Sequence, residues 1–316
     1  MTDSSPSQNK NYRFAVLGTD IAYSLSPKLH GFFMEKTGIN GAYDILDLST
    51  ESMNRWFEEL GWQDYDGFNV TIPHKTRLLS HIQKITPVAR LLGAINTVYK
   101  DDTGMLCGDN TDVDGFQASL PEKVLNDLMG KTILIVGSGG ASRAVAYGLM
   151  QQHVGQILLK VRSTSFYQPT FAAMENIRTE LSSNTRLSVL NNWDSPALRP
   201  DRLAMVINTT PVGTLNFPVE EDLSIPATLI AKLSPKCLIY DLVYNPLETS
   251  LMKLAHNHNL TAKNGLDMLV RQGAKAFCKW VKQDNIITET MIQEANTYLA
   301  GVLKNEPQSL ANTVVS

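Results

Sequence analysis

Residues 131–151, KTILIVGSGGASRAVAYGLMQ, constrain what this chain can fold into more than any other stretch. Residues 132–136 form a short apolar run rich in β-branched side chains, which is the pattern of a strand buried on both faces. Three glycines follow at once, and apolar residues then recur at helical spacing up to residue 151. A second apolar run at 156–161 completes a strand, loop, helix, strand unit of about thirty residues.

The glycine-rich loop of this unit predicts a diphosphate site. Such a turn aims free backbone N–H groups and the positive end of the helix dipole at one point. The residues concerned are Gly137, Ser138, Gly139, Gly140 and Ala141. We interpret the unit as a Rossmann-type dinucleotide-binding unit. Position 142 is Ser where the dinucleotide pattern has a third Gly or Ala, so a tight turn in some other α/β protein is the alternative reading.

The end of the second strand favours NADP over NAD. An NAD-binding unit usually places Asp or Glu there to hold the ribose 2′-hydroxyl, whereas the 2′-phosphate of NADP calls for a cation. This chain has Arg162 followed by Ser163 and Thr164, and no acidic residue appears before Glu175. We predict that Arg162 holds the phosphate, with Ser163 or Thr164 as neutral donors. A solvated loop arginine is the alternative.

The composition narrows the range of partners. A chain of 316 residues is long for one core and suits two domains. Hydrophobic residues make up 43% and charged residues 19%, as in an ordinary soluble globular protein. The formal net charge of −3 argues against a nucleic acid or an anionic membrane as partner, so we expect a small-molecule ligand.

Cysteine and histidine usage predicts neither disulfides nor a metal site. Cys107, Cys237 and Cys278 are far apart and odd in number, which argues for reduced thiols in a cytoplasmic protein. The six histidines form no ligand set, so we predict no metal. The first dozen residues are polar, without the apolar core of a signal peptide, and no run reaches membrane-spanning length. We expect flexible tails at 1–11 and 305–316.

The region before the glycine loop predicts another open α/β domain. Apolar and amphipathic runs alternate as strand, helix, strand, helix, strand, at 13–18, 26–36, 42–48, 51–60 and 67–72. Ser26 is able to cap the first of these helices, and Pro27 suits its first turn. Residues 96–100 and 105–107 indicate a hairpin. The fold class is therefore α/β with two open-sheet domains, and we expect a ligand-binding cleft between them.

The elements after the glycine loop make the first domain discontinuous. A strand at 203–207 and another ending at Asp241 continue the second sheet to about residue 262. A helix after Gly265 and another at 287–304 then return to the first domain. We predict a substrate-binding and catalytic domain at 12–112 plus 265–304, and an NADP-binding domain at 113–264.

Seven short motifs occur in order along the chain. They are SLSP at 24–27, NVTIPHK at 69–75, GAINT at 93–97, DNTD at 109–112, GSGGA at 137–141, NTTPVG at 208–213 and GLDMLVRQ at 265–272. With these motifs the chain resembles the shikimate dehydrogenase family, which includes the quinate/shikimate dehydrogenases, from residue 12 to about residue 304. Val161 stands where the family often has Asn, and Val113-Asp114 replaces a more usual glycine-containing step.

The resemblance implies a function and a set of site residues. The implied reaction is the NADP-dependent, reversible reduction of 3-dehydroshikimate to shikimate, in aromatic amino acid biosynthesis. Lys75 and Asp112 match the family's catalytic pair. The implied substrate-binding residues are Ser24, Ser26, Thr71, Asn96, Asp112, Tyr244 and Gln272. The implied cofactor-binding residues beyond the glycine loop and Arg162-Ser163 are Thr209, Val212, Gly213, Gly265 and Met268, the last of which has an ordinary core methionine as its alternative.

Two competing functions stay open at this point. A quinate dehydrogenase, or an enzyme that uses both acids, is the competitor within the enzyme class. A protein that only binds NADP, as a redox or metabolite sensor, is the competitor from another class, although binding alone would not need both Lys75 and Asp112. We expect a monomer or a homodimer.

Overall fold

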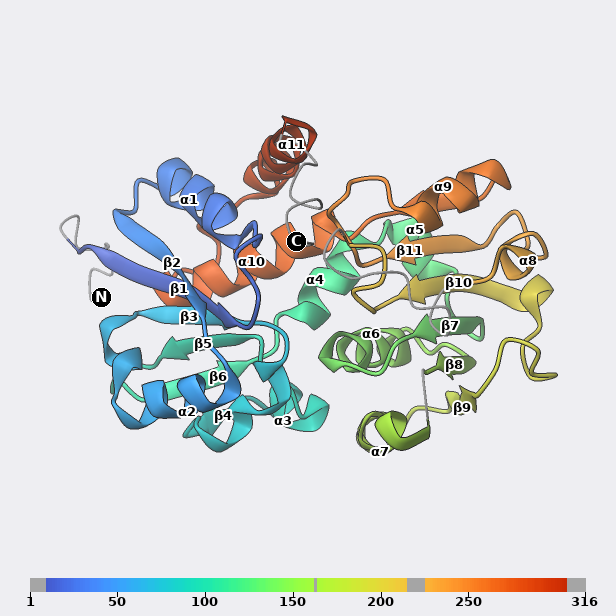
Figure 1. Cartoon of the computed structure of the whole chain (residues 1–316), viewed down its shortest axis with the longest axis horizontal. Coiled ribbons are helices and arrows are strands. Elements are labelled where there is room, and N and C mark those ends of the chain that lie inside the picture. Colours follow the sequence, from blue (N-terminus) through green and yellow to red (C-terminus); the bar gives the residue numbers. More distant parts are fainter. Residues whose placement is uncertain (1–9, 162–163, 215–224, 306–316) are drawn as a thin grey trace, which may run out of the picture. The chain divides into compact units, whose positions relative to one another are not determined.

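The computed structural model describes residues 10–161, 164–214 and 225–305 (Figure 1). The chain divides into two compact units. Unit 1 consists of Met1–Thr111 and Gln272–Leu299, and unit 2 consists of Asp112–Arg271 and Ala300–Ser316. Each unit is built on one six-stranded sheet, so the α/β class predicted from the sequence is confirmed.

The sheet of unit 1 is mixed, with the strand order β2-β1-β3-β5-β6-β4. Its strands are β1 (Tyr12–Gly18), β2 (Gly41–Asp47), β3 (Gly67–Val70), β4 (Lys84–Ile85), β5 (Thr97–Lys100) and β6 (Leu106–Asp109). Strands β2, β1 and β3 are parallel, whereas β5 runs antiparallel to both β3 and β6. The antiparallel pair β5 and β6 is the hairpin that the sequence predicts.

Helices cover the two faces of this sheet. They are α1 (Ser26–Thr37), α2 (Thr50–Glu58), α3 (Pro87–Leu92), the larger parts of α10 (Leu266–Val281) and α11 (Glu289–Asn305), and the short 3₁₀ turns η1 (Gly61–Asp64), η2 (His74–Thr76) and η3 (Leu78–Ser80). Met53 and Phe57 of α2 pack on one face of the sheet with Leu17 and Phe68. Trp280 of α10 packs by its ring on the opposite side against Phe14, at a centroid distance of 4.8 Å.

The start of α1 differs from the expectation. The residue before the helix is Leu25, no side chain caps it, and Ser26 is already inside the first turn. The expected cap by Ser26 is therefore wrong. The Ser24 hydroxyl oxygen instead accepts the Ser26 backbone N–H at 3.2 Å. The Ser26 side chain instead forms a hydrogen bond with the side chain of Tyr43.

Unit 2 has a fully parallel sheet with the order β12-β11-β10-β7-β8-β9. Its strands are β7 (Thr132–Val136), β8 (Gln156–Lys160), β9 (Arg186–Leu190), β10 (Leu203–Asn208), β11 (Leu238–Asp241) and β12 (Thr261–Lys263). Counted from the first strand, this is the 3-2-1-4-5-6 order of a dinucleotide-binding Rossmann fold. The order reverses between β7 and β10, and ligands of such folds bind at the carboxyl ends of the strands at that point.

Two helices of unit 2 precede the first strand of its sheet, and the others follow its strands. They are α4 (Asp112–Ser119), α5 (Glu122–Asn126), α6 (Gly140–Gln151), α7 (Thr164–Glu180), α8 (Ala227–Ile230) and α9 (Ser250–Asn257), with the 3₁₀ turn η4 (Pro200–Arg202). Fully buried strand residues such as Leu134, Leu158 and Val206 form the core. All three cysteines of the chain are buried and form no disulfide. Among the described residues, no helix combines the length and apolarity needed to cross a membrane.

Candidate active site

The glycine loop of unit 2 follows β7 at the topological switch point. Gly137 has φ of 114°, and a side chain there would place its Cβ 2.6 Å from Thr209 Oγ1. Thr209 follows β10, and both its backbone N–H and its hydroxyl donate to the carbonyl of Val136, at 2.9 and 2.8 Å. The loops after β7 and β10 are therefore in direct contact, and only glycine fits at position 137.

The space beside Gly139 is open, whereas neighbouring atoms fill the space beside Gly137. It is the residue before α6, no side chain caps this helix, and a Cβ built on Gly139 would meet no atom within 4 Å. The first-turn N–H groups of α6 and the space beside Gly139 together suit a diphosphate. The residues present thus fit the dinucleotide that the sequence predicts.

These two glycines give a matched pair of predictions. Gly137→Ala should lower the free energy of unfolding by about 1–3 kcal/mol, because the new methyl group meets Thr209 at a positive φ. Gly139→Ala should leave stability nearly unchanged and weaken NADP binding, because its methyl group enters the space for the diphosphate. Urea unfolding and calorimetric NADP titration of both variants test this. Equal stability losses in both would contradict it.

Asn208 and Asp241 shape the loop that carries Thr209, Val212 and Gly213, and we did not assign them a role from the sequence. They are paired neighbours at the ends of β10 and β11, and Asn208 Nδ2 donates to Asp241 Oδ1 at 2.8 Å. Asn208 Nδ2 also donates to the carbonyl of Val212 at 3.1 Å. Burial raises the pKa of Asp241, although three donors oppose that shift. Asn208 belongs to the NTTPVG motif, but its hydrogen bond with Asp241 follows only from the pairing of β10 with β11.

The sheet edge of unit 1 gathers most of the predicted substrate residues. Ser24 follows β1 and Thr71 and Lys75 follow β3, and these strands are parallel neighbours. Asn96 immediately precedes β5. Because β5 is antiparallel to β3, the start of β5, and with it Asn96, lies beside the end of β3. The backbone N–H of Ile95 donates to the carbonyl of Lys75 at 2.7 Å, which ties the last two segments together. Topology thus brings residues far apart in sequence to one edge.

The amide of Asn96 has a fixed orientation. Its Oδ1 accepts the backbone N–H of Thr111 at 2.7 Å and the hydroxyl of Thr97 at 2.9 Å. Its Nδ2 donates to the Thr111 hydroxyl oxygen at 3.1 Å and to Gln272 Oε1 at 3.3 Å. Since a backbone N–H can only donate, the oxygen of Asn96 must face Thr111, and Nδ2 faces Gln272. Both Nδ2 hydrogens already have acceptors, so Asn96 would donate to a ligand only in place of one of them.

Comparison with known proteins identifies the family of the chain. The model of the shikimate dehydrogenase substrate binding domain matches residues 16–98. The shikimate dehydrogenase (NADP⁺) of Magnetococcus marinus is 34% identical over 266 residues, which cover 84% of this chain and 89% of that protein. The chain belongs to the shikimate dehydrogenase family.

Solved structures of the family have the same fold. A shikimate dehydrogenase in complex with NADP⁺ is 31% identical, with a TM-score of 0.76, and the match covers 92% of this chain and 96% of the other. The Thermus thermophilus shikimate 5-dehydrogenase in complex with NADP(H) and shikimate is 30% identical, with a TM-score of 0.71 over 91% and 99% of the two chains. The Rossmann-type interpretation of the glycine loop agrees with these likenesses.

The residues to which the family resemblance gives substrate or catalytic roles fall in both units. Unit 1 contains Ser24, Ser26, Thr71, Lys75, Asn96 and Gln272, and unit 2 contains Asp112 and Tyr244. Asp112 is 5% exposed in the first turn of α4, and Ser26 is 8% exposed. Lys75 and Tyr244 are half-buried. The substrate-domain match at 16–98 includes Ser24, Ser26, Thr71, Lys75 and Asn96.

The remaining cofactor residues of the family lie in unit 2. The backbone N–H of Gly265 donates to the carbonyl of Val243 at 3.1 Å, and a Cβ at Gly265 would lie 2.0 Å from the carbonyl oxygen of Leu242. Met268 is 7% exposed on α10, one turn further along the chain. Arg162 and Ser163 lie outside the described residues.

Two further polar residues of the listed motifs make buried contacts beside the substrate edge of unit 1, and the sequence analysis assigns them no role. Asn69, the first residue of NVTIPHK, is 6% exposed and accepts the Tyr43 hydroxyl at 2.8 Å. Asp109, the first residue of DNTD, pairs with Lys279 of α10 at 2.8 Å and accepts the Thr86 hydroxyl at 2.6 Å. Burial alone would raise the pKa of Asp109, but Lys279 and Thr86 lower it below its ordinary value.

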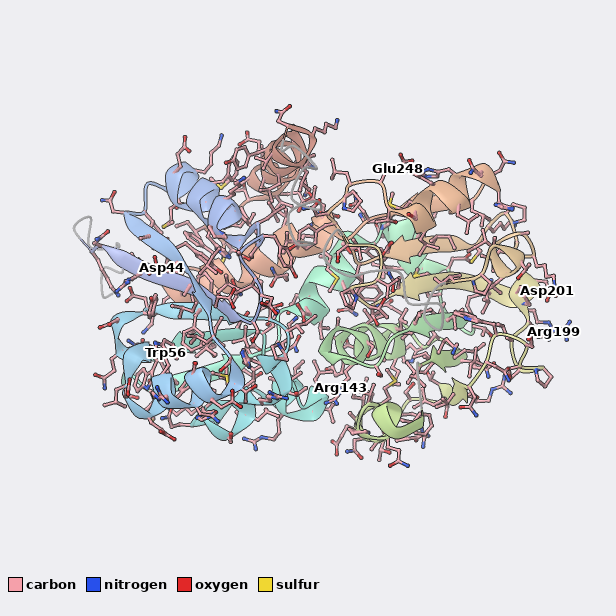
Figure 2. All side chains as sticks on the ribbon, in the orientation of Figure 1. Asp44, Trp56, Arg143, Arg199, Asp201 and Glu248 are labelled. Atoms are coloured by element: carbon pink, nitrogen blue, oxygen red, sulfur yellow. The ribbon has the colours of Figure 1, made fainter. Side chains whose placement is uncertain are left out.

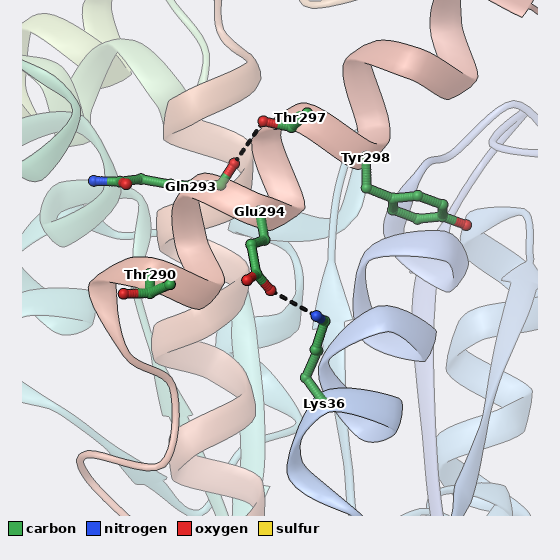
Figure 3. A pocket seen from close by; sticks show the side chains of 6 residues that line it. All are labelled: Lys36, Thr290, Gln293, Glu294, Thr297 and Tyr298. Carbon is green, nitrogen blue, oxygen red and sulfur yellow. Dashed lines mark hydrogen bonds and ion pairs between the residues drawn. The ribbon is translucent and has the colours of Figure 1, made fainter.

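A separate surface pocket of unit 1 lies between α1 and α11 (Figure 3). Lys36 Nζ and Glu294 Oε2 form an ion pair there, 2.7 Å apart. The other lining residues are Thr290, Gln293, Thr297 and Tyr298. None of these residues is among those that the family resemblance implies, so we assign the pocket no part in the site. Within the described residues, no group of three or more His, Cys, Asp or Glu side chains could hold a metal ion.

Proposed function

We propose that this protein is an NADP-dependent shikimate dehydrogenase that interconverts 3-dehydroshikimate and shikimate. The observation that carries the proposal is 34% identity, over 84% of the chain, to a relative named for that activity. The Rossmann strand order and the open space beside Gly139 support the cofactor. We further propose a cytoplasmic location, which the three buried, unpaired cysteines support.

In the proposed mechanism, most of the residues that bind the substrate belong to unit 1, and the residues that bind the cofactor belong to unit 2. The cofactor supplies a hydride when bound. The hydroxyls of Ser24 and Ser26 bind the substrate carboxylate, together with Tyr244. Asn96 donates through Nδ2 to a ring hydroxyl oxygen in place of Gln272 Oε1, its more distant acceptor at 3.3 Å. Thr71 and Gln272 contact the other ring hydroxyls. Neutral donors recognise the anion here without the desolvation cost of a buried arginine.

The proton transfer is assigned to Lys75. The ketone oxygen becomes an alkoxide as the hydride arrives, and it must be protonated as it forms. The ammonium of Lys75 gives this proton in the reduction and takes it back, when neutral, in the oxidation. The carboxylate of Asp112, the other member of the family's catalytic pair, accepts a hydrogen bond from a ring hydroxyl.

A purified sample given NADP and shikimate tests the function directly. Growth of the NADPH absorbance band would support the proposal, and no growth with either NADP or NAD would overturn it. The competing sensor function predicts saturable NADP binding without turnover. Comparing kcat/KM for shikimate and quinate tests the other competitor. Quinate carries an extra hydroxyl and a puckered ring, so we expect it to be about ten- to a hundredfold worse.

The choice of NADP over NAD is assigned to Arg162. A charge-assisted contact to the 2′-phosphate contributes roughly 1.5 to 3 kcal/mol. Arg162→Ala should therefore raise the KM for NADP by about one to two orders of magnitude and leave the KM for NAD almost unchanged. Steady-state kinetics with both cofactors measure this. Equal losses for both would make Arg162 a structural residue.

A further inference from the structure

Two consecutive side-chain hydrogen bonds in unit 2 connect helices α6 and α7 to the backbone of the glycine loop. Thr170 of α7 is 1% exposed, and its hydroxyl donates to the backbone carbonyl of Ser138 at 2.6 Å. Arg143 of α6 donates through Nε to the oxygen of the same hydroxyl at 3.2 Å. Figure 2 shows Arg143 on α6, on the side where α7 lies.

The direction of this chain of bonds is fixed by its donors. The guanidinium of Arg143 can only donate, so the Thr170 oxygen accepts there and its single proton goes to Ser138. The Thr170 hydroxyl therefore holds the Ser138 carbonyl on the side of α7. The bond is short and shielded from water, so it favours one orientation of that carbonyl.

Holding this carbonyl also sets the direction of the next N–H group. The peptide bond between Ser138 and Gly139 is trans, so the Gly139 N–H points away from the Ser138 carbonyl. Gly139 has no side chain to restrain the peptide, and the space on its Cβ side is open. Without the Thr170 hydroxyl this peptide could rotate and present its carbonyl oxygen to an incoming anion.

We propose that Thr170, held by Arg143, is a positioning residue of the cofactor site that presets the Ser138–Gly139 peptide for the diphosphate. This inference rests on the proposed NADP-binding function. It predicts a kinetic signature that differs from that of Arg162. The diphosphate is common to NADP and NAD, so loss of the Thr170 hydroxyl should weaken both cofactors by the same factor.

Three variants test the proposal. Thr170→Val removes the hydroxyl at nearly constant shape, and Thr170→Ser restores it. Thr185→Val is the matched control, because Thr185 is 2% exposed and its hydroxyl donates to the carbonyl of Val154 at 2.7 Å, before the amino end of β8. If Thr170→Val does not fold, Thr170→Ala takes its place.

The measurements are the Kd of NADP and of NAD by calorimetry, the KM of shikimate, and Tm. Thr170→Val should raise both cofactor Kd values about tenfold, with their ratio and the shikimate KM unchanged. Thr170→Ser and Thr185→Val should bind like wild type. Cofactor affinity equal to wild type in Thr170→Val, a loss for NADP alone, or an equal loss in Thr185→Val would overturn the inference. Wild-type protein that binds neither cofactor would overturn the proposed function and this inference with it.

Discussion

Replacing Lys75 by alanine is expected to lower kcat for shikimate oxidation by about 10² to 10⁴ and to leave the Kd of NADP unchanged. In the proposed mechanism the Lys75 side chain moves the proton of the reacting hydroxyl, and Lys75 belongs to unit 1, whereas the proposed cofactor residues belong to unit 2. Steady-state kinetics and an NADP titration of the same preparation measure the two effects separately.

The matched control is Lys253→Ala, an exposed lysine on α9 that no site motif includes. It should behave as wild type in both assays. If Lys75→Ala instead raised the shikimate KM and kept kcat, Lys75 would be a binding residue and the proton would have to move through another group.

The stability of the protein is expected to fall steeply below about pH 6.5 because of His30. This residue of α1 is 0% exposed; its ring stacks on that of Tyr43 at 4.6 Å and lies 4.8 Å from the tilted ring of Trp280. Neither ring nitrogen has a hydrogen-bond partner. Burial lowers the pKa of His30 to about 3, and the nearby Asn69 acts weakly in the opposite direction.

The direction of the change in unfolding free energy with pH depends on whether the folded or the unfolded state binds the proton. Between about pH 6.5 and about pH 3 the unfolded chain protonates His30 and the folded chain does not, so the free energy of unfolding falls as the pH falls. The slope is about 1.4 kcal/mol per pH unit, which gives a loss of about 2 kcal/mol at pH 5. Below about pH 3 both states carry the proton, and the loss stops growing.

Urea unfolding at pH 7.5, 6 and 5 tests this with two variants. His30→Leu should lack this part of the pH dependence, so its unfolding free energy should fall by about 2 kcal/mol less than that of wild type between pH 7.5 and 5. His258→Leu, at an exposed position after α9, should keep the wild-type pH dependence. Parallel curves for wild type and His30→Leu would show that His30 takes up its proton without cost in the folded state.

The sequence predicts those parts of the fold that local patterns determine. The apolar run at 132–136 coincides with β7, because a β-branched strand buried on both faces has one periodicity and a clear glycine end. The hairpin of β5 and β6 was predicted in the same way, from two short apolar runs and the turn residues between them. The expected cap by Ser26 is wrong because α1 begins one residue earlier than a Ser26 cap requires, so that Ser26 lies in the first turn and Leu25 occupies the cap position.

The contacts that support the candidate site depend on distant partners and could not be predicted. Asn208 and Asp241 are 33 residues apart, and they meet only because β10 and β11 pair in this register. Thr170 reaches Ser138 across 32 residues. A single sequence shows that these side chains are polar, but their neighbours follow from sheet order and helix packing. The roles of Lys75, Asp112 and the substrate residues came from family resemblance and stay predictions.

The strand order also matters for engineering the protein. The loop for the diphosphate follows β7, whereas Arg162, to which we assign the choice between the two cofactors, follows β8, so they are separate pieces of the chain. Two buried side chains stand before and after positions 161–169 in the chain. Lys160 is 3% exposed and donates to the carbonyl of Asn191 at 3.2 Å, and Thr170 is 1% exposed and donates to the carbonyl of Ser138 at 2.6 Å. A variant series that exchanges residues next to Arg162 to change the cofactor preference should therefore keep both Lys160 and Thr170.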